Sequence, residues 1–181
     1  YQVDIKSGKT IQLTTISGTH NASVSSDGTM VLDQYSNATT PNEISILNIK
    51  TRIATTTLVK ADNPFTGKID LPRIEMVSLT AADGTTPLNG RIIYPANFDA
   101  TKKYPVMVYV YGGPHAQMIT NSYLDGANLW MYWMAEQGYL VYTVDNRGSD
   151  NRGFAFESVI HAQLGNNEID DQMKGVEYLK S

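Results

Sequence analysis

The chain has 181 residues, with 14 Lys and Arg against 18 Asp and Glu, a net charge of −4 and no cysteine. This balance argues against a basic nucleic-acid-binding face, and the lack of cysteine excludes disulfides, Cys-ligated metal sites and a cysteine nucleophile. The longest apolar or aromatic run, Val106–Tyr111, is far shorter than the about 20 residues that a membrane helix needs.

Both ends of the sequence lie within regular patterns. The chain begins at Tyr1 in an alternating strand pattern, and it stops at Ser181 in a helical pattern without the usual Gly or Pro stop. The sequence therefore predicts a piece of a larger protein, with part of the function outside it.

Residues 1–65 have the pattern of short antiparallel strands. They are rich in Thr, they lack a helical period, and turn residues interrupt them regularly. The predicted hairpins pair residues 3–5 with 10–13, 22–25 with 29–35, and 43–49 with 53–58. Strands in this arrangement favour about one and a half terminal blades of a β-propeller, with a small β-sandwich fragment as the alternative.

Residues 66–181 alternate strands and helices, after a turn-rich segment at 61–67. The predicted strands are 73–79, 88–94, 106–111 and 139–144, and the predicted helices are 126–137 and a last one from about 167. The strand at 106–111 is apolar on both faces, which is typical of the middle of a sheet covered by helices. We expect the buried helix stripes to be Ala127, Trp130, Met131 and Met134 in the first helix, and Ile169, Met173 and Val176 in the second. This is an α/β pattern.

In α/β sheets the chemistry lies at the carboxyl ends of the strands, here the loops 111–115 and 145–149. Gly112 and Gly113 would let the backbone approach a ligand closely. The hydroxyl of Tyr111 could donate to an oxyanion, but its ring could equally cover the core. Arg147 is expected to pair with a carboxylate and fix its loop.

No complete catalytic or metal site is readable. The nucleophile pattern G-x-S-x-G does not occur in the sequence. The three histidines lack metal-ligand spacing, so we predict neither a metal nor a cofactor. His115 is either a solvated loop residue or a catalytic one, whereas His20 and His161 are predicted to be structural.

Several motifs between residues 103 and 172 resemble those of the prolyl oligopeptidase family, in its dipeptidyl peptidase IV branch. They are Lys103-Tyr104-Pro105, Val110-Tyr111-Gly112-Gly113-Pro114, Asp145-Asn146-Arg147-Gly148-Ser149, His161-Ala162, Leu164-Gly165 and Glu168-Ile169-Asp170-Asp171-Gln172.

The resemblance implies a serine exopeptidase with an N-terminal β-propeller and a C-terminal α/β-hydrolase domain. Residues 1–65 would be the last propeller strands, and residues 66–181 the first half of the hydrolase domain. The implied enzyme removes dipeptides or tripeptides after Pro or Ala through a Ser-His-Asp triad. Its serine would follow Ser181, so the triad is expected outside this chain, and the isolated chain is expected to be inactive.

The resemblance also assigns roles within the two loops. Tyr111 matches the tyrosine whose hydroxyl helps to form the oxyanion hole of the family. Arg147 matches a structural arginine beside the site, where Gly112 and Gly113 also lie. Residues that would bind the amino terminus of the substrate have no match here.

Two other functions remain open at this point. The chain could come from another α/β-hydrolase, such as an acylaminoacyl peptidase or an esterase, or from a catalytically dead peptide-binding homologue. The expected partner is a peptide with penultimate Pro or Ala, not a nucleic acid. Unpaired strands predict a homo-oligomer. A periplasmic, secreted or membrane-anchored location is implied by the resemblance alone.

Overall fold

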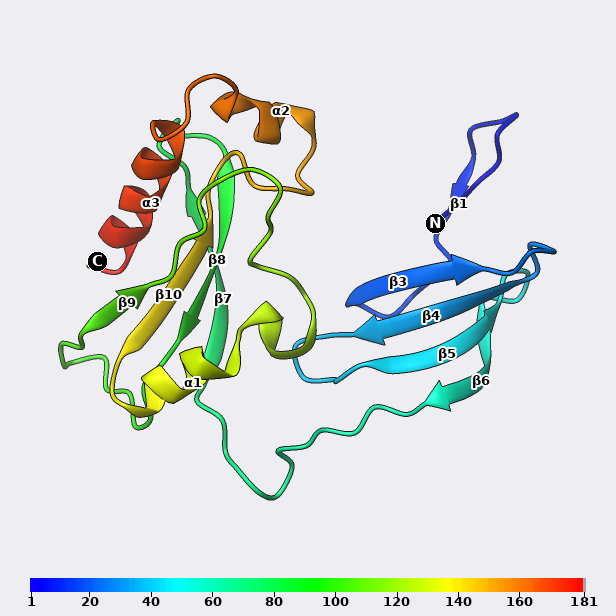
Figure 1. Cartoon of the computed structure of the whole chain (residues 1–181), viewed down its shortest axis with the longest axis horizontal. Coiled ribbons are helices and arrows are strands. Elements are labelled where there is room, and N and C mark those ends of the chain that lie inside the picture. Colours follow the sequence, from blue (N-terminus) through cyan, green and yellow to red (C-terminus); the bar gives the residue numbers. More distant parts are fainter. Residues whose placement is uncertain (181) are drawn as a thin grey trace. The chain divides into compact units, whose positions relative to one another are not determined.

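The computed structural model describes residues 1–180, which form two units (Figure 1). The first unit comprises residues 1–68 together with 121–124, and the second comprises residues 69–120 together with those from 125 on. Among the described residues, no helix has both the length and the apolar character needed to span a membrane.

The first unit consists of β-strands. Its small two-stranded sheet pairs β1 (Gln2–Val3) with β2 (Thr10–Ile11). Its larger antiparallel sheet has the order β3 (Thr19–Val24), β4 (Met30–Ser36), β5 (Glu43–Asn48) and β6 (Ile53–Val59). These pairings confirm the three predicted hairpins, with ends shifted by a few residues.

Local side-chain bonds explain why these turns form where they do. In the turn between β3 and β4, Asp27 accepts hydrogen bonds from the hydroxyl of Ser25 at 2.6 Å and from the backbone N–H of Thr29 at 3.1 Å. Such Asx interactions replace backbone partners that the strand ladder cannot supply. The turn is therefore encoded within a few residues, which is why the sequence reveals it.

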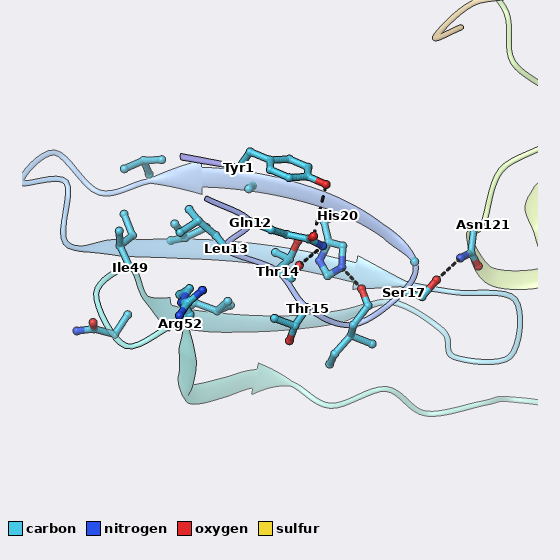
Figure 2. A pocket seen from close by; sticks show the side chains of 17 residues that line it. Tyr1, Gln12, Leu13, Thr14, Thr15, Ser17, His20, Ile49, Arg52 and Asn121 are labelled. Atoms are coloured by element: carbon cyan, nitrogen blue, oxygen red, sulfur yellow. Dashed lines mark hydrogen bonds between the residues drawn. The ribbon is translucent and has the colours of Figure 1, made fainter. Parts of the chain in front are cut away.

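A hollow of about 720 Å³ lies in the first unit (Figure 2). One of its walls carries His20, whose Nδ1 lies 2.8 Å from Asp33 and whose Nε2 lies 2.9 Å from the carbonyl of Ile16. Both ring nitrogens thus hold neighbouring chain segments together, as expected for a structural histidine.

The second unit is built on a mixed four-stranded sheet with helices. In spatial order the strands are β7 (Ile74–Thr80), β8 (Pro87–Ile93), β10 (Leu140–Asp145) and β9 (Val106–Val108). Strand β9 runs parallel to β10, whereas β8 is antiparallel to both β7 and β10. Its helices are α1 (Leu129–Glu136), α2 (Phe154–Glu157), η2 (Ser158–Ile160) and α3 (Asn167–Tyr178). The short helix η1 (Tyr123–Gly126) begins in the first unit and ends in the second.

The two long helices cover opposite faces of the central strand β10, which is buried along its whole length. Tyr142 lies so close to Gly175 of α3 that a Cβ there would meet its ring at 2.6 Å. The next residue, Thr143, points to the other face because side chains alternate along a strand. It lies 3.5 Å from the guanidinium of Arg91, which also reaches the sulfur of Met131 in α1 at 3.6 Å.

The strand expected in the middle of the sheet lies instead at its edge. Strand β9 is the last in the order found among residues 1–180, and Val106, Val108 and Val110 are exposed. An apolar run shows that both faces of a strand suit burial, but it does not show which strands lie alongside it within this chain. The ladder does extend beyond β9, since the N–H of Tyr109 donates to the carbonyl of Tyr142 at 2.8 Å.

The predicted apolar stripes of the helices also need correction. In α1, Met131 is buried as expected, but Trp130 is exposed. In α3, Ile169 is 60% exposed and Met173 is 51% exposed, whereas the buried residues are Glu168, Asp171 and Gly175. This helix is oriented by polar bonds and by the close approach of Tyr142, so its buried face is not its most apolar one.

Candidate functional site

The loops that follow β9 and β10 are hydrogen-bonded to each other. The side-chain N–H of Asn146 donates to the carbonyl of Gly112 at 2.9 Å, and the backbone N–H of Asp150 donates to the carbonyl of Ala116 at 3.0 Å. Parallel neighbouring strands end at the same edge of a sheet, which brings the two loops together. The structure thus unites the two segments singled out in the sequence.

A hollow of about 650 Å³ lies beside these loops. The loop after β9 contributes Pro114 and His115, and the loop after β10 contributes Gly148 and Asp150. The remaining wall comes from the segment that contains α2 and η2, with the residues Phe154, Glu157, Ser158, Ile160, His161, Ala162 and Leu164. Most of this lining is apolar, and both of its histidines are exposed to solvent. The hollow therefore offers both apolar and polar side chains to a ligand.

Tyr111 stands at the start of the first loop with 58% of its surface exposed. Little of the core holds its ring, so its position depends on the backbone that follows. Gly112 has φ +79°, in the left-handed region that favours glycine, while the φ of Gly113 lies outside that region. The first glycine therefore shapes the bend after Tyr111.

The side chain of Arg147 is nearly buried within the second unit. Its Nε and one terminal nitrogen each lie 2.9 Å from the carboxylate of Asp171, and its backbone N–H donates to the same group at 3.0 Å. A fourth bond, 2.9 Å long, comes from the N–H of Ala82. The hydrogen bonds to Asp171 are the main reason why the pKa of Arg147 lies above its ordinary value. Asp171 is the carboxylate that fixes this loop.

A second carboxylate connects Arg147 to the turn between β7 and β8. Asp83 accepts from the other terminal nitrogen of Arg147 at 3.1 Å. It also accepts from the hydroxyl of Thr86 at 2.6 Å and from the N–H groups of Thr86 and Thr85 at 2.8 and 2.9 Å. The hydrogen bonds from Thr86 chiefly, followed by the N–H of Thr85 and the charge of Arg147, hold the pKa of Asp83 far below its usual value. The guanidinium thus connects the β7–β8 turn, the loop after β10 and α3.

Asp145 fixes the other side of the site. Its carboxylate accepts from the N–H groups of Met118 and Ile119 at 2.8 and 3.0 Å, which orders the long loop after β9. Burial raises its pKa, and these two hydrogen bonds and Arg91 oppose the rise. The loop that carries Tyr111 is therefore attached to β10 at both Asn146 and Asp145.

Part of this loop pair lies in a segment that is similar to a known protein family. The model of the prolyl oligopeptidase family matches residues 127–181, which include the loop after β10 and helix α3. This segment is similar to members of that family. The resemblance inferred from the sequence motifs is confirmed.

Individual known proteins are similar to this chain over nearly its whole length. Human dipeptidyl peptidase 8 is 30% identical over 98% of this chain. A solved Bacteroides ovatus structure, named as a candidate dipeptidyl aminopeptidase IV, is 44% identical over 98% of the chain with a TM-score of 0.91. Dipeptidyl peptidase 4 of Porphyromonas gingivalis is 27% identical over 99% with a TM-score of 0.87. The chain spans 20% of the human protein and 25% of each solved chain.

Sequence reasoning missed three residues of this candidate site. Asn146, Asp171 and Asp145 were quoted only as parts of motifs, yet each has a buried side chain that bonds segments far apart in the chain. One sequence feature could have indicated two of them, Asp145 and Asn146, namely a polar residue at the end of an apolar strand. Such a residue is buried with the strand, and a buried polar group requires a hydrogen-bond partner.

A substitution at Gly148 tests how closely the loop after β10 packs against Ile160. It has φ +99°, and a Cβ there would meet two carbons of Ile160 at 2.6 and 2.7 Å. Gly148→Ala should lower the free energy of unfolding by about 2–4 kcal/mol, from backbone strain plus overpacking. Gly138→Ala is the matched control, because φ there is +90° but no atom lies within 4 Å of the added Cβ. It should cost only the strain, about 1–2 kcal/mol. Urea unfolding measures both, and equal losses would refute the tight contact with Ile160.

Proposed function

We propose that this chain is part of a serine exopeptidase that removes dipeptides or tripeptides from peptides with penultimate Pro or Ala. Residues 1–65 supply terminal strands of its β-propeller, and residues 66–181 supply the first half of its α/β-hydrolase domain. Similarity to dipeptidyl peptidases over nearly the whole chain supports this assignment.

The observation that carries the proposal is the placement of Tyr111. Its side chain is exposed, and it follows a parallel strand on a loop that Asn146 fixes. Two later residues of the same loop, Pro114 and His115, line a hollow. When the serine attacks the scissile carbonyl, negative charge develops on the carbonyl oxygen. A fixed hydroxyl donor stabilises that charge more strongly in the transition state than in the ground state. Tyr111 thus serves as one donor of the oxyanion hole.

The residues around Tyr111 have structural roles in this proposal. Gly112 sets the bend after the tyrosine, Gly113 continues the loop, and Arg147 fixes the neighbouring loop to α3 through Asp171. The Ser, His and Asp of the triad come from elsewhere in the protein. No metal or cofactor takes part in the proposed reaction.

The direct test is hydrolysis by the full-length protein. It should release the chromophore from Gly-Pro-p-nitroanilide, and a fluorophosphonate should block this turnover by reacting with the serine. The 181-residue chain alone should show no turnover. Faster hydrolysis of an acyl ester than of Gly-Pro-anilide would favour an esterase or acylaminoacyl peptidase instead. Binding of the peptide without product would indicate a catalytically dead homologue.

The exposed edge strand β9 also supports association between copies of the protein. We propose a homo-oligomer of this chain on this basis, and light scattering of the 181-residue chain would test it.

A further inference from the structure

Asn146 is almost completely buried, with 1% of its surface exposed, and its side chain connects three parts of the second unit. Its Nδ2 donates to the carbonyl of Gly112 at 2.9 Å and to the carbonyl of Arg147 at 2.7 Å. Its Oδ1 accepts from the Nε2 of Gln172 in α3 at 2.9 Å. All polar atoms of this amide therefore have partners, which is the condition for burying it without a large cost.

The orientation of the amide follows from its partners. The Nε2 of Gln172 also donates to the carbonyl of Val144 at 3.1 Å, and a carbonyl can only accept. Gln172 consequently presents its amino group to this region, and Asn146 must turn its oxygen toward Gln172. Both N–H groups of Asn146 then face the two backbone carbonyls. Helix α3 thus determines which way the amide points at Gly112.

The bond to the carbonyl of Gly112 acts on the peptide unit between Gly112 and Gly113, one residue after Tyr111. With 58% of Tyr111 exposed, its ring packing alone does not fix where the hydroxyl lies. The left-handed conformation of Gly112 determines the direction in which the chain leaves Tyr111. A buried hydrogen bond to that residue restricts its rotation, and therefore restricts the tyrosine that precedes it.

We propose that Asn146 is the positioning residue for the Tyr111 hydroxyl, acting through the Gly112 carbonyl and oriented by Gln172. This inference rests on the proposed function, in which Tyr111 is an oxyanion donor. Asn146 itself touches no substrate. Its contribution is geometric, because a displacement of about 1 Å at a catalytic group can cost about 10²-fold in rate.

The test is a double-mutant cycle in the full-length peptidase with Gly-Pro-p-nitroanilide as substrate. Asn146→Asp keeps the acceptor for Gln172 but places an oxygen against the carbonyls of Gly112 and Arg147. It should lower kcat about 10-fold or more while KM changes less than about 2-fold, since the loss is confined to the transition state. In a Tyr111→Phe background the same change should lower kcat little further, because the hydroxyl that it positions is already gone.

Ser149→Ala is the matched control. Ser149 is buried in the same loop and its hydroxyl donates to the carbonyl of Asn146 at 2.7 Å, but it makes no bond to Gly112. This change should weaken the loop without lowering kcat by more than about 2-fold. If Asn146→Asp fails to fold, Gln172→Leu is the second variant, because it removes the donor that orients the amide and leaves Asn146 in place.

The outcomes distinguish the positioning role of Asn146 from the proposed function of the protein. Multiplicative losses from Tyr111→Phe and Asn146→Asp, or an unchanged kcat in Asn146→Asp, would overturn the positioning role and leave the proposed function intact. An equal loss of kcat in Ser149→Ala would also overturn it, since a general loosening would then explain the effect. No hydrolysis by the unaltered full-length protein would instead refute the proposed function, and the positioning role with it.

Discussion

Tyr111→Phe in the full-length protein should lower kcat for Gly-Pro-p-nitroanilide by about 10²-fold or more, with little change in KM, as follows from its proposed role as an oxyanion donor. The substitution removes one hydroxyl from an exposed ring and leaves the bend at Gly112 unaltered. Substrate binding and folding should therefore persist. The loss appears in kcat because the hydroxyl bonds an oxygen that carries full negative charge only near the transition state.

Tyr139→Phe is the control for removal of a tyrosine hydroxyl. Tyr139 lies just before β10, at the amino-terminal end of that strand, whereas the candidate site lies at its carboxyl end. We expect its kcat to match that of the unaltered protein. If Tyr111→Phe also leaves kcat unchanged, Tyr111 is not in the oxyanion hole, and another donor must be sought.

Asp171→Asn should lower the free energy of unfolding of the second unit by about 3–5 kcal/mol. Asp171 has no exposed surface and accepts from the Nε, one terminal nitrogen and the backbone N–H of Arg147, as well as from Ala82. Removing its charge leaves a nearly buried guanidinium without its main partner. The penalty is large because a buried charge loses its hydration as well as its counter-ion.

Urea unfolding followed by tryptophan fluorescence measures this loss in the 181-residue chain. The only two tryptophans, Trp130 and Trp133, lie in α1 of the second unit, so the signal reports on that unit. Asp170→Asn is the control, since Asp170 is the exposed neighbour on the same helix. It should change the free energy of unfolding by less than about 1 kcal/mol. A loss below about 1 kcal/mol in Asp171→Asn would show that solvent replaces the ion pair.

For helix α3, the sequence pattern predicts where the helix begins but not which face is buried. Its start near residue 167 was predicted correctly from local sequence, because helix formation depends on neighbours within a turn or two. Its buried face was predicted wrongly. Periodicity identifies Ile169 and Met173 as sharing one side, but it contains no information about which side meets the sheet.

In the candidate site too, some features could be predicted from the sequence and others could not. The motifs between residues 103 and 172 predicted a resemblance to the family whose model matches residues 127–181, and the order of these short stretches along the chain is part of the signal. The function of Asn146 could not be read from those motifs, because its partner Gly112 lies 34 positions earlier and its partner Gln172 lies 26 positions later. Only folding brings these groups within hydrogen-bond distance.

The sequence by itself determined the hairpins of the first unit, the four strands and two long helices of the second, the two loops at the strand ends and the resemblance to the family. These features depend on turn residues, side-chain periodicity and contiguous motifs, all of which act over short separations. Tertiary structure alone decided that β9 lies at an edge in this chain, that α3 packs against β10 at Gly175 and bonds the loop after β10 through Asp171, and that Asn146 bonds the Gly112 carbonyl. Each of these depends on contacts between residues distant in the chain, whose geometry no local pattern specifies.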